Sequence, residues 1–336
     1  MIIFDSHSLF DKQLPVSSPS MCKEPAPQSI TTGFTVDELK AVLIDESAPI
    51  AKRTRTVFLL RQIGTADAID ALASALRSPS VLLSHEIAFV LGQMQNSHAI
   101  PIMSKVLEDV TYHPVTRHEA AEALGAIGNV SQLPLLEKYS TDSAVEVAHT
   151  CQIAADRLRF VKDHPNWDKE YVSAYHCVDP APPAHETDIA ALQRQLTDGS
   201  LSLFDRYRAM FKLRDLNTES AVAALASGMS DSSPVLRHEI AYVFGQMTNP
   251  ASAPALTAAL EDAGEHSMVR HEAAEALGSL AAECGAESSA ATTALLDVLK
   301  RFQQDEDRIV SESCDVALDI HDYWSSDEIE TAIVQD

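Results

Sequence analysis

Apolar residues recur at the spacing of an α-helix along most of this chain, and short polar breaks separate the helical stretches. Val36, Leu39 and Leu43 form the first apolar stripe, because residues three and seven positions apart lie on one helix face. Thr35 and Glu38 occupy the two positions of a capping box, which marks a helix start. Stretches of this kind, separated by breaks rich in Ser, Pro, Asp and Asn, predict an all-α protein.

The helical pattern has an internal period. The stretch from Arg117 to Gly125 returns unchanged from Arg270 to Gly278, and residues 53–125 align without gaps on residues 206–278 at an offset of 153. Within each half, related motifs lie 33 residues apart, which is the length of helical hairpins that stack side by side. We therefore predict two duplicated halves, each built from about four hairpins.

Breaks in the pattern give the expected boundaries. The hairpins of the first half cover roughly residues 36–65, 66–97, 98–130 and 131–160, and those of the second half cover 188–217, 218–250, 251–284 and 288–324. We expect a flexible N-terminal tail at residues 1–34, a first half at 35–160, a proline-containing linker at 161–187, a second half at 188–324 and a C-terminal tail at 325–336.

Composition supports the helical prediction and narrows the choice of partners. Apolar residues make up 46% of the 336 residues, and most of them are Ala and Leu, which favour helices. The formal net charge of −24 disfavours direct binding of nucleic acid and favours a basic partner. Five scattered cysteines without a Cys-x-x-Cys motif indicate neither a disulfide framework nor a thiolate zinc site. With no signal-peptide core or membrane-length apolar run, we expect a soluble cytoplasmic protein without membrane association.

Four His-Glu pairs occupy matched positions in the two middle hairpins of each half. A single pair at a helix start is usually structural, but stacked repeats bring equivalent positions onto one surface. Imidazole and carboxylate together suit zinc, iron, copper or manganese, and this set is large enough for two ions. We predict a dinuclear metal site between the facing halves, built from His85-Glu86, His118-Glu119, His238-Glu239 and His271-Glu272.

Spacing alone leaves the carboxylate ligands undecided. His118 and Glu122 are four residues apart and share a helix face, whereas Glu119 is rotated by about 100°. Either Glu119 reaches the metal from the helix start together with His118, or Glu122 is the ligand and Glu119 faces another group. Glu122 has no counterpart in the other motif type, in which Phe89 and Tyr242 occupy the matching positions. A third possibility is therefore that Glu122 orients the imidazoles without binding metal.

Two other positions repeat with the motifs. Glycines lie seven residues after each histidine, which we interpret as close helix packing or a helix end rather than ligand contact; they are Gly92, Gly125, Gly245 and Gly278. Arginines precede three of the four histidines and are expected to pair with neighbouring carboxylates; they are Arg117, Arg237 and Arg270, with Ser84 at the fourth position.

Two halves of helical hairpins, each with two Ser/Arg-His-Glu motifs, resemble the deoxyhypusine hydroxylase family over roughly residues 36–324. The resemblance implies HEAT-like repeats around two iron (Fe) ions. It also implies a monooxygenase that acts on the deoxyhypusine side chain of a eukaryotic translation initiation factor, using dioxygen and an electron donor. Its implied metal ligands are His85, His118, Glu119, His238, His271 and Glu272, and Glu86 and Glu239 would position the substrate.

Two other functions fit the same motifs. The chain could be a non-catalytic HEAT scaffold in which the His-Glu pairs are packing residues and the acidic surface binds a basic protein. It could also be a dinuclear hydrolase that uses the same ligands around zinc or manganese. Hydroxylation of an unactivated C–H bond requires a redox-active metal, so the metal content of protein purified without added metal separates the three functions.

Overall fold

A computed structural model of the chain describes residues 33–167, 171, 173–175, 177–283 and 290–325. The first half contains α1 (Val36–Ile44), α2 (Ile50–Ile63), α3 (Ala66–Ala73), α4 (Val81–Gln93), α5 (Ile100–Glu108), α6 (Pro114–Ile127), α7 (Leu133–Tyr139) and α8 (Val145–Asp163). The second half contains α10 (Ile189–Thr197), α11 (Leu203–Leu216), α12 (Glu219–Ala226), α13 (Pro234–Met247), α14 (Ala253–Glu261), α15 (Ser267–Glu283), α16 (Ala290–Phe302) and α17 (Arg308–Ser325).

These sixteen helices form eight hairpins, and the described part of the chain contains no strand. Short 3-10 turns precede or follow some of the helices, at Ser97–Ala99, Val130–Gln132, Ser227–Ser230 and Pro250–Ser252. The prediction of an all-α fold with two halves of four hairpins is confirmed. The tails expected at residues 1–34 and 325–336 fall almost entirely outside the described residues.

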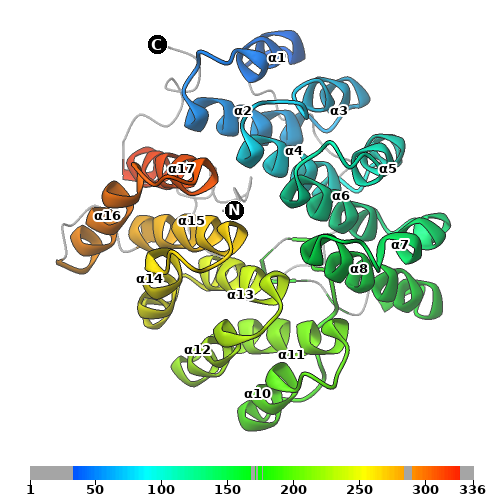
Figure 1. Ribbon diagram of the computed structural model, residues 1–336, viewed down its shortest axis with the longest axis vertical. Helices are drawn as coiled ribbons and strands as arrows, with labels where there is room; N and C mark the ends of the chain where they lie inside the picture. The colour runs from blue at the N-terminus through cyan, green and yellow to red at the C-terminus, as the bar shows by residue number, and fades with distance from the viewer. Residues whose placement is uncertain (1–32, 168–170, 172, 176, 284–289, 326–336) are drawn as a thin grey trace, which may run out of the picture.

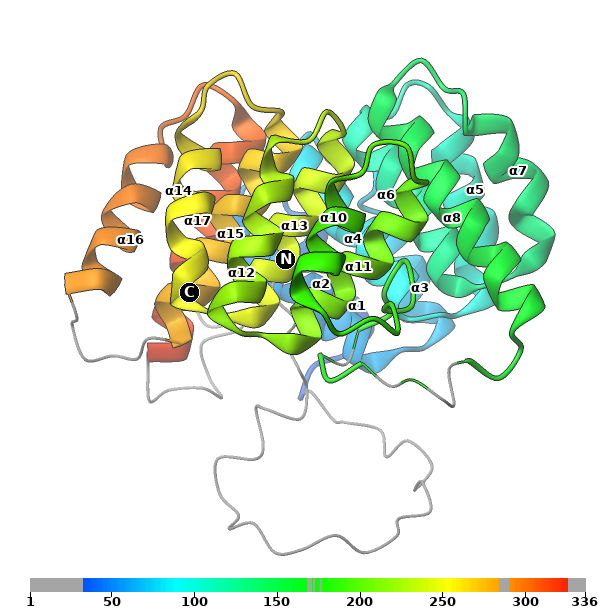
Figure 2. The same ribbon diagram turned by 90° about the horizontal axis from the view of Figure 1, so that it is seen from below.

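The second helices of successive hairpins pack side by side and form the inner wall of a ring. In the first half α2, α4, α6 and α8 are neighbours in that order, and in the second half α11, α13, α15 and α17 are. The ring closes because α8 packs against α11 and α13, while α17 packs against α2 and α4 (Figure 1). Seen from below, neighbouring helices run alongside one another (Figure 2). The two halves therefore face each other around a common centre.

Capping residues set the register of the inner helices that carry the motifs. The hydroxyls of Ser80 and Ser233 accept hydrogen bonds from backbone N–H groups in the first turns of α4 and α13. His113 and His266 do the same for α6 and α15 through Nδ1. Each motif histidine follows its capping residue by five positions, so the four His-Glu pairs lie at the same height in the ring.

Each motif glycine permits close contact between adjacent inner helices. A Cβ atom at Gly92 would lie 2.7 Å from Cα of Ala123, and one at Gly278 would lie 2.8 Å from Cβ of Ala317. Both distances are shorter than real carbon contacts allow. Gly125 and Gly245 face alanines of the next inner helix in the same way. The interpretation of these glycines as packing positions is confirmed.

The motif arginines join one hairpin to the next. Arg117 donates through Nε to the carbonyl of Leu107 at the end of α5, 3.0 Å away, and its Nη2 lies 2.6 Å from Oδ2 of Asp142 in the following hairpin. Arg270 makes the matching bonds in the second half, to Leu260 and Asp305. Arg237 pairs with Glu265 at 2.5 Å. The expected pairing of all three arginines with carboxylates is confirmed.

The segment between the halves is anchored by a buried ion pair. Arg214 on α11 is fully buried, and its Nη2 lies 2.7 Å from Oδ2 of Asp179. Arg157 on α8 donates to the carbonyl of Asp179 at 3.0 Å, and Gln93 at the end of α4 accepts from the backbone N–H of Val178 at 2.8 Å. The segment thus binds helices from both halves. No described helix has the length and hydropathy needed to span a membrane.

Candidate metal centre

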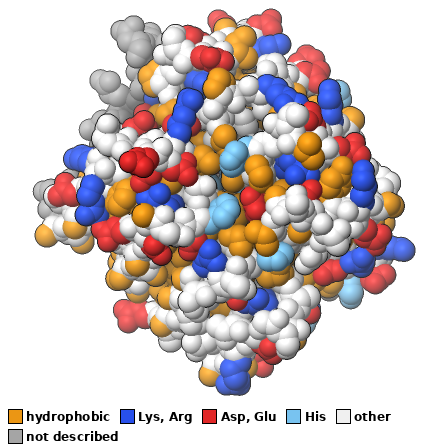
Figure 3. All heavy atoms as spheres, in the orientation of Figure 1, with side chains coloured by type: hydrophobic (Ala, Val, Ile, Leu, Met, Phe, Trp, Pro, Cys, Tyr) orange, Lys and Arg blue, Asp and Glu red, His pale blue; other side chains and the backbone are white. Residues whose placement is uncertain are grey.

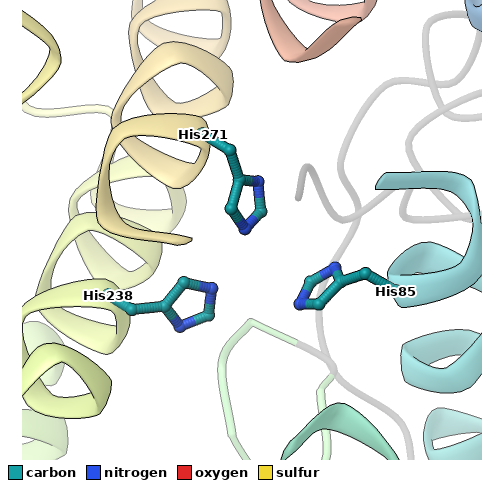
Figure 4. A group of neighbouring side chains, drawn as sticks. All are labelled: His85, His238 and His271. Carbon is teal, nitrogen blue, oxygen red and sulfur yellow. The ribbon is translucent and has the colours of Figure 1, made fainter. Parts of the chain in front are cut away.

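The four motif histidines converge at the centre of the ring from four different inner helices. Distances between ring centroids are 4.9 Å for His85 and His271, 5.5 Å for His85 and His118, and 5.4 Å for His238 and His271. His118 and His238 are 5.6 Å apart. Figure 4 shows His85, His238 and His271 pointing toward one another from α4, α13 and α15.

This centre lies below the molecular surface. The four histidines are at most 6% exposed. Histidine and apolar side chains gather over the middle of the face seen in Figure 3. Electrostatic interactions at the centre are therefore only weakly screened by water.

One glutamate of each half approaches both imidazoles of that half. Oε2 of Glu119 lies 3.1 Å from Nε2 of His85 and 3.7 Å from Nε2 of His118. Oε2 of Glu272 lies 3.3 Å from Nε2 of His238 and 3.9 Å from Nε2 of His271. The structure thus contains two matched sets of two imidazoles and one carboxylate. Of the two carboxylates that spacing left open, Glu119 is the one that faces the imidazoles.

The Nε2 atoms of all four histidines are buried and make no well-directed hydrogen bond with any described residue, although those of His85 and His238 lie within ion-pair distance of Glu119 and Glu272. A buried polar atom without a hydrogen bond costs about 1–3 kcal/mol, so four such nitrogens in one place require an explanation. Coordination of a metal ion by Nε2 supplies one. Two groups of ligand atoms lie within 4.8 Å of one another, namely His85-His118-Glu119 and His85-His238-His271. The centre can therefore hold metal.

The Nδ1 atoms face polar groups on the outer side of the cluster. Nδ1 of His85 lies 3.2 Å from Oε1 of Glu86, and Nδ1 of His118 lies 3.4 Å from the hydroxyl of Thr150. Nδ1 of His271 lies 3.7 Å from Oε1 of Glu275, the counterpart of Glu122. Metal-binding histidines commonly use the second nitrogen in this way, which fixes the ring orientation. Sequence analysis did not find Thr150, because α8 carries no His-Glu motif.

Burial and mutual repulsion keep two of the imidazoles neutral. Burial, with a smaller contribution from His85 and His238, lowers the pKa of His118 well below its usual value. Burial also lowers the pKa of His271, to about 4. For His85, burial acts in the same direction, but the Glu119 and Glu86 carboxylates outweigh it and raise the pKa. Imidazoles bind metal ions in their neutral form. The carboxylates of Glu119 and Glu86 favour a positive charge at the position of His85.

Glu86 and Glu239, the two glutamates next to His85 and His238, are also buried. Burial and the neighbouring Glu275 carboxylate raise the pKa of Glu86 to about 7. Burial and the Glu122 carboxylate raise the pKa of Glu239 well above its usual value. His85 lies beside Glu86, but no cationic side chain among the described residues contacts Glu239, so a bound cation would stabilise the Glu239 carboxylate.

Comparisons with known proteins agree with this architecture. The sequence profile of HEAT repeats matches residues 76–155, 189–278 and 222–318. Deoxyhypusine hydroxylase of Drosophila melanogaster is 45% identical over 88% of this chain and 95% of the relative, and that of Homo sapiens is 44% identical over 88% and 93%. The structure of human deoxyhypusine hydroxylase in complex with glycerol covers 85% of this chain and 96% of its own, with a TM-score of 0.80 and 44% identity. This chain therefore belongs to the deoxyhypusine hydroxylase family.

Proposed function

We propose that this chain is a deoxyhypusine monooxygenase that converts the deoxyhypusine side chain of a translation initiation factor to hypusine. The reaction inserts one oxygen atom of dioxygen into a C–H bond and reduces the other to water, with two electrons from a donor. The observation that carries the proposal is the convergence of four buried Nε2 atoms on the carboxylates of Glu119 and Glu272, without a well-directed hydrogen bond among the described residues. Family membership supports the same reaction.

Two iron ions are the proposed cofactor, one for each half of the site. His85, His118 and Glu119 would hold one ion, and His238, His271 and Glu272 would hold the other. When bound, iron supplies the redox chemistry that activates dioxygen, which no amino-acid side chain provides. The Nδ1 contacts of His85 and His118 support the imidazole orientation that turns Nε2 inward.

The proposed substrate is a long aliphatic chain with two amines, and both amines are protonated at neutral pH. Glu86 and Glu239 are proposed to receive them through charge-assisted hydrogen bonds, which are strengthened by burial. The net charge of −24 favours encounter with a basic surface on the partner protein. A scaffold function would leave the four buried imidazole nitrogens unexplained, and a zinc hydrolase would not oxidise carbon.

Metal analysis combined with a hydroxylation assay tests this function. Protein purified without added metal is expected to contain iron and to show a visible absorption band that changes on reduction. It should add one oxygen atom to a deoxyhypusine-containing factor, as detected by mass spectrometry. Zinc, manganese or no metal at all, together with an unchanged factor, would contradict the proposal.

A further inference from the structure

The two halves of the centre differ one helical turn beyond the histidines. Phe89 on α4 and Tyr242 on α13 occupy matched positions, four residues after His85 and His238. Their rings meet edge to face, with centroids 6.4 Å apart, and both side chains are buried. Only the second half therefore carries a phenolic hydroxyl at this position.

On α13 that hydroxyl has no hydrogen-bond partner among the described residues, and neither does Oε1 of Glu239. Tyr242 and Glu239 are three residues apart, so their side chains lie on neighbouring positions of one helix face. Burial raises the pKa of Tyr242 well above its usual value, and the nearby Cys177 and Glu239 act in the same direction, so the hydroxyl keeps its proton. Two buried, unpaired polar atoms on one helix face are rare unless a ligand uses them.

The matched positions on α4 offer one acceptor group instead of two. Oε1 of Glu86 already lies 3.2 Å from Nδ1 of His85. Phe89 has no polar atom. Among the described residues, Nδ1 of His238 makes no matching contact with Glu239. The metal ligands repeat in both halves, but the groups available to a cationic ligand do not.

We propose that Tyr242 is a substrate-positioning residue. Its hydroxyl oxygen and the Glu239 carboxylate together receive the primary ammonium group of the substrate. A primary ammonium has three N–H donors, while a phenolic oxygen and a carboxylate are both acceptors. This inference rests on the proposed function and deepens it, because it gives the substrate a single orientation in a centre whose metal ligands are duplicated.

The test is the Tyr242→Phe variant of the iron-loaded full chain, with Phe89→Tyr as the matched control. Each variant places in one half the aromatic residue that the other half already carries. Tyr242→Phe should raise the KM for the deoxyhypusine-containing factor about tenfold or more and should change kcat less. Under anaerobic conditions, calorimetry should show the same loss of affinity for free deoxyhypusine. Phe89→Tyr should leave Kd within about twofold of the wild-type value.

Three results would overturn the inference. These are an unchanged KM and Kd in Tyr242→Phe, the same loss of affinity in Phe89→Tyr, or a loss of iron from Tyr242→Phe, which would assign the hydroxyl to the metal centre. A Tyr242→Phe/Glu239→Gln double variant adds a second measurement. If both groups hold one ammonium, the double variant should lose less affinity than the product of the single losses. A wild-type chain that fails to hydroxylate the factor refutes the proposed function instead.

Discussion

Substitution of Gly92 by alanine tests how closely the inner helices must pack to form the centre. The new Cβ atom would lie 2.7 Å from Cα and 2.9 Å from Cβ of Ala123 on α6. Normal carbon contacts are about 3.5–4.0 Å, so α4 and α6 must separate locally by about 1 Å. Such overpacking costs about 1–3 kcal/mol, and the better helix propensity of alanine offsets about 1 kcal/mol of it.

The matched position in the second half provides the control. A Cβ atom at Gly245 would lie 3.2 Å from both Cα and Cβ of Ala276, which requires a smaller shift. Gly245→Ala should therefore be close to neutral, because the gain in helix propensity balances the contact. Gly92→Ala should lower the free energy of unfolding by about 1–2 kcal/mol relative to Gly245→Ala.

Urea unfolding of the two metal-free variants measures this difference, and iron analysis measures its effect on the centre. Nε2 of His85 on α4 lies 3.1 Å from Oε2 of Glu119 on α6. Separation of these two helices should therefore also weaken iron binding in the first half. The reasoning would be refuted if Gly92→Ala were as stable as Gly245→Ala, or if it kept full iron affinity despite the lower stability.

Three further substitutions probe the centre, the linking segment and pH dependence. His118→Ala should lose about half of the bound iron because it removes one imidazole from the first set. The control variant His98→Ala changes a partly exposed surface histidine and should keep the iron. Equal iron contents in the two variants would contradict the ligand assignment. Arg214→Met leaves Asp179 buried without its ion-pair partner and should lower the free energy of unfolding, measured by chemical denaturation, by about 3–5 kcal/mol. A change of less than about 1 kcal/mol would contradict this account. Burial lowers the pKa of His149 in the folded chain, so His149 binds a proton at a higher pH in the unfolded chain than in the folded one. The free energy of unfolding should therefore fall as the pH drops below about 6.5. His149→Gln should flatten this pH dependence in unfolding experiments between about pH 7.5 and 5.5.

Most of the fold could be predicted from the sequence because a helical hairpin is a local structure. The capping box at Thr35 and Glu38 forms as expected, with the Thr35 N–H 2.7 Å from the Glu38 carboxylate. Helix α8 continues to Asp163, slightly beyond the expected end at residue 160. It ends there because His164 precedes Pro165, and a proline disfavours helical geometry in the residue before it.

The centre was predictable only where the sequence repeats itself. The four histidines could be found because their spacing recurs, but spacing on one helix does not say which neighbouring helix a side chain meets. Glu119 faces the centre because α4 brings His85 to within 3.1 Å of it. Thr150 could not be found, since its contact with His118 depends on how α8 packs against α6. The division of the metal ligands between two iron ions stays a prediction.

The duplication also limits where substrate specificity can reside. If every residue of the centre were repeated in both halves, a substrate with two different ends would bind in two opposite orientations with equal free energy. A tenfold preference for one orientation requires about 1.4 kcal/mol, and residues that are identical and make the same contacts in both halves cannot provide it. The preference must come from matched positions that differ in residue or in contacts. Within the two Ile-containing motifs the positions that differ in residue are Ser84 and Arg237, Phe89 and Tyr242, and Leu91 and Phe244. Arg237 is already paired with Glu265, and Leu91 and Phe244 are apolar, so the hydroxyl of Tyr242 is the difference best suited to orient an amine.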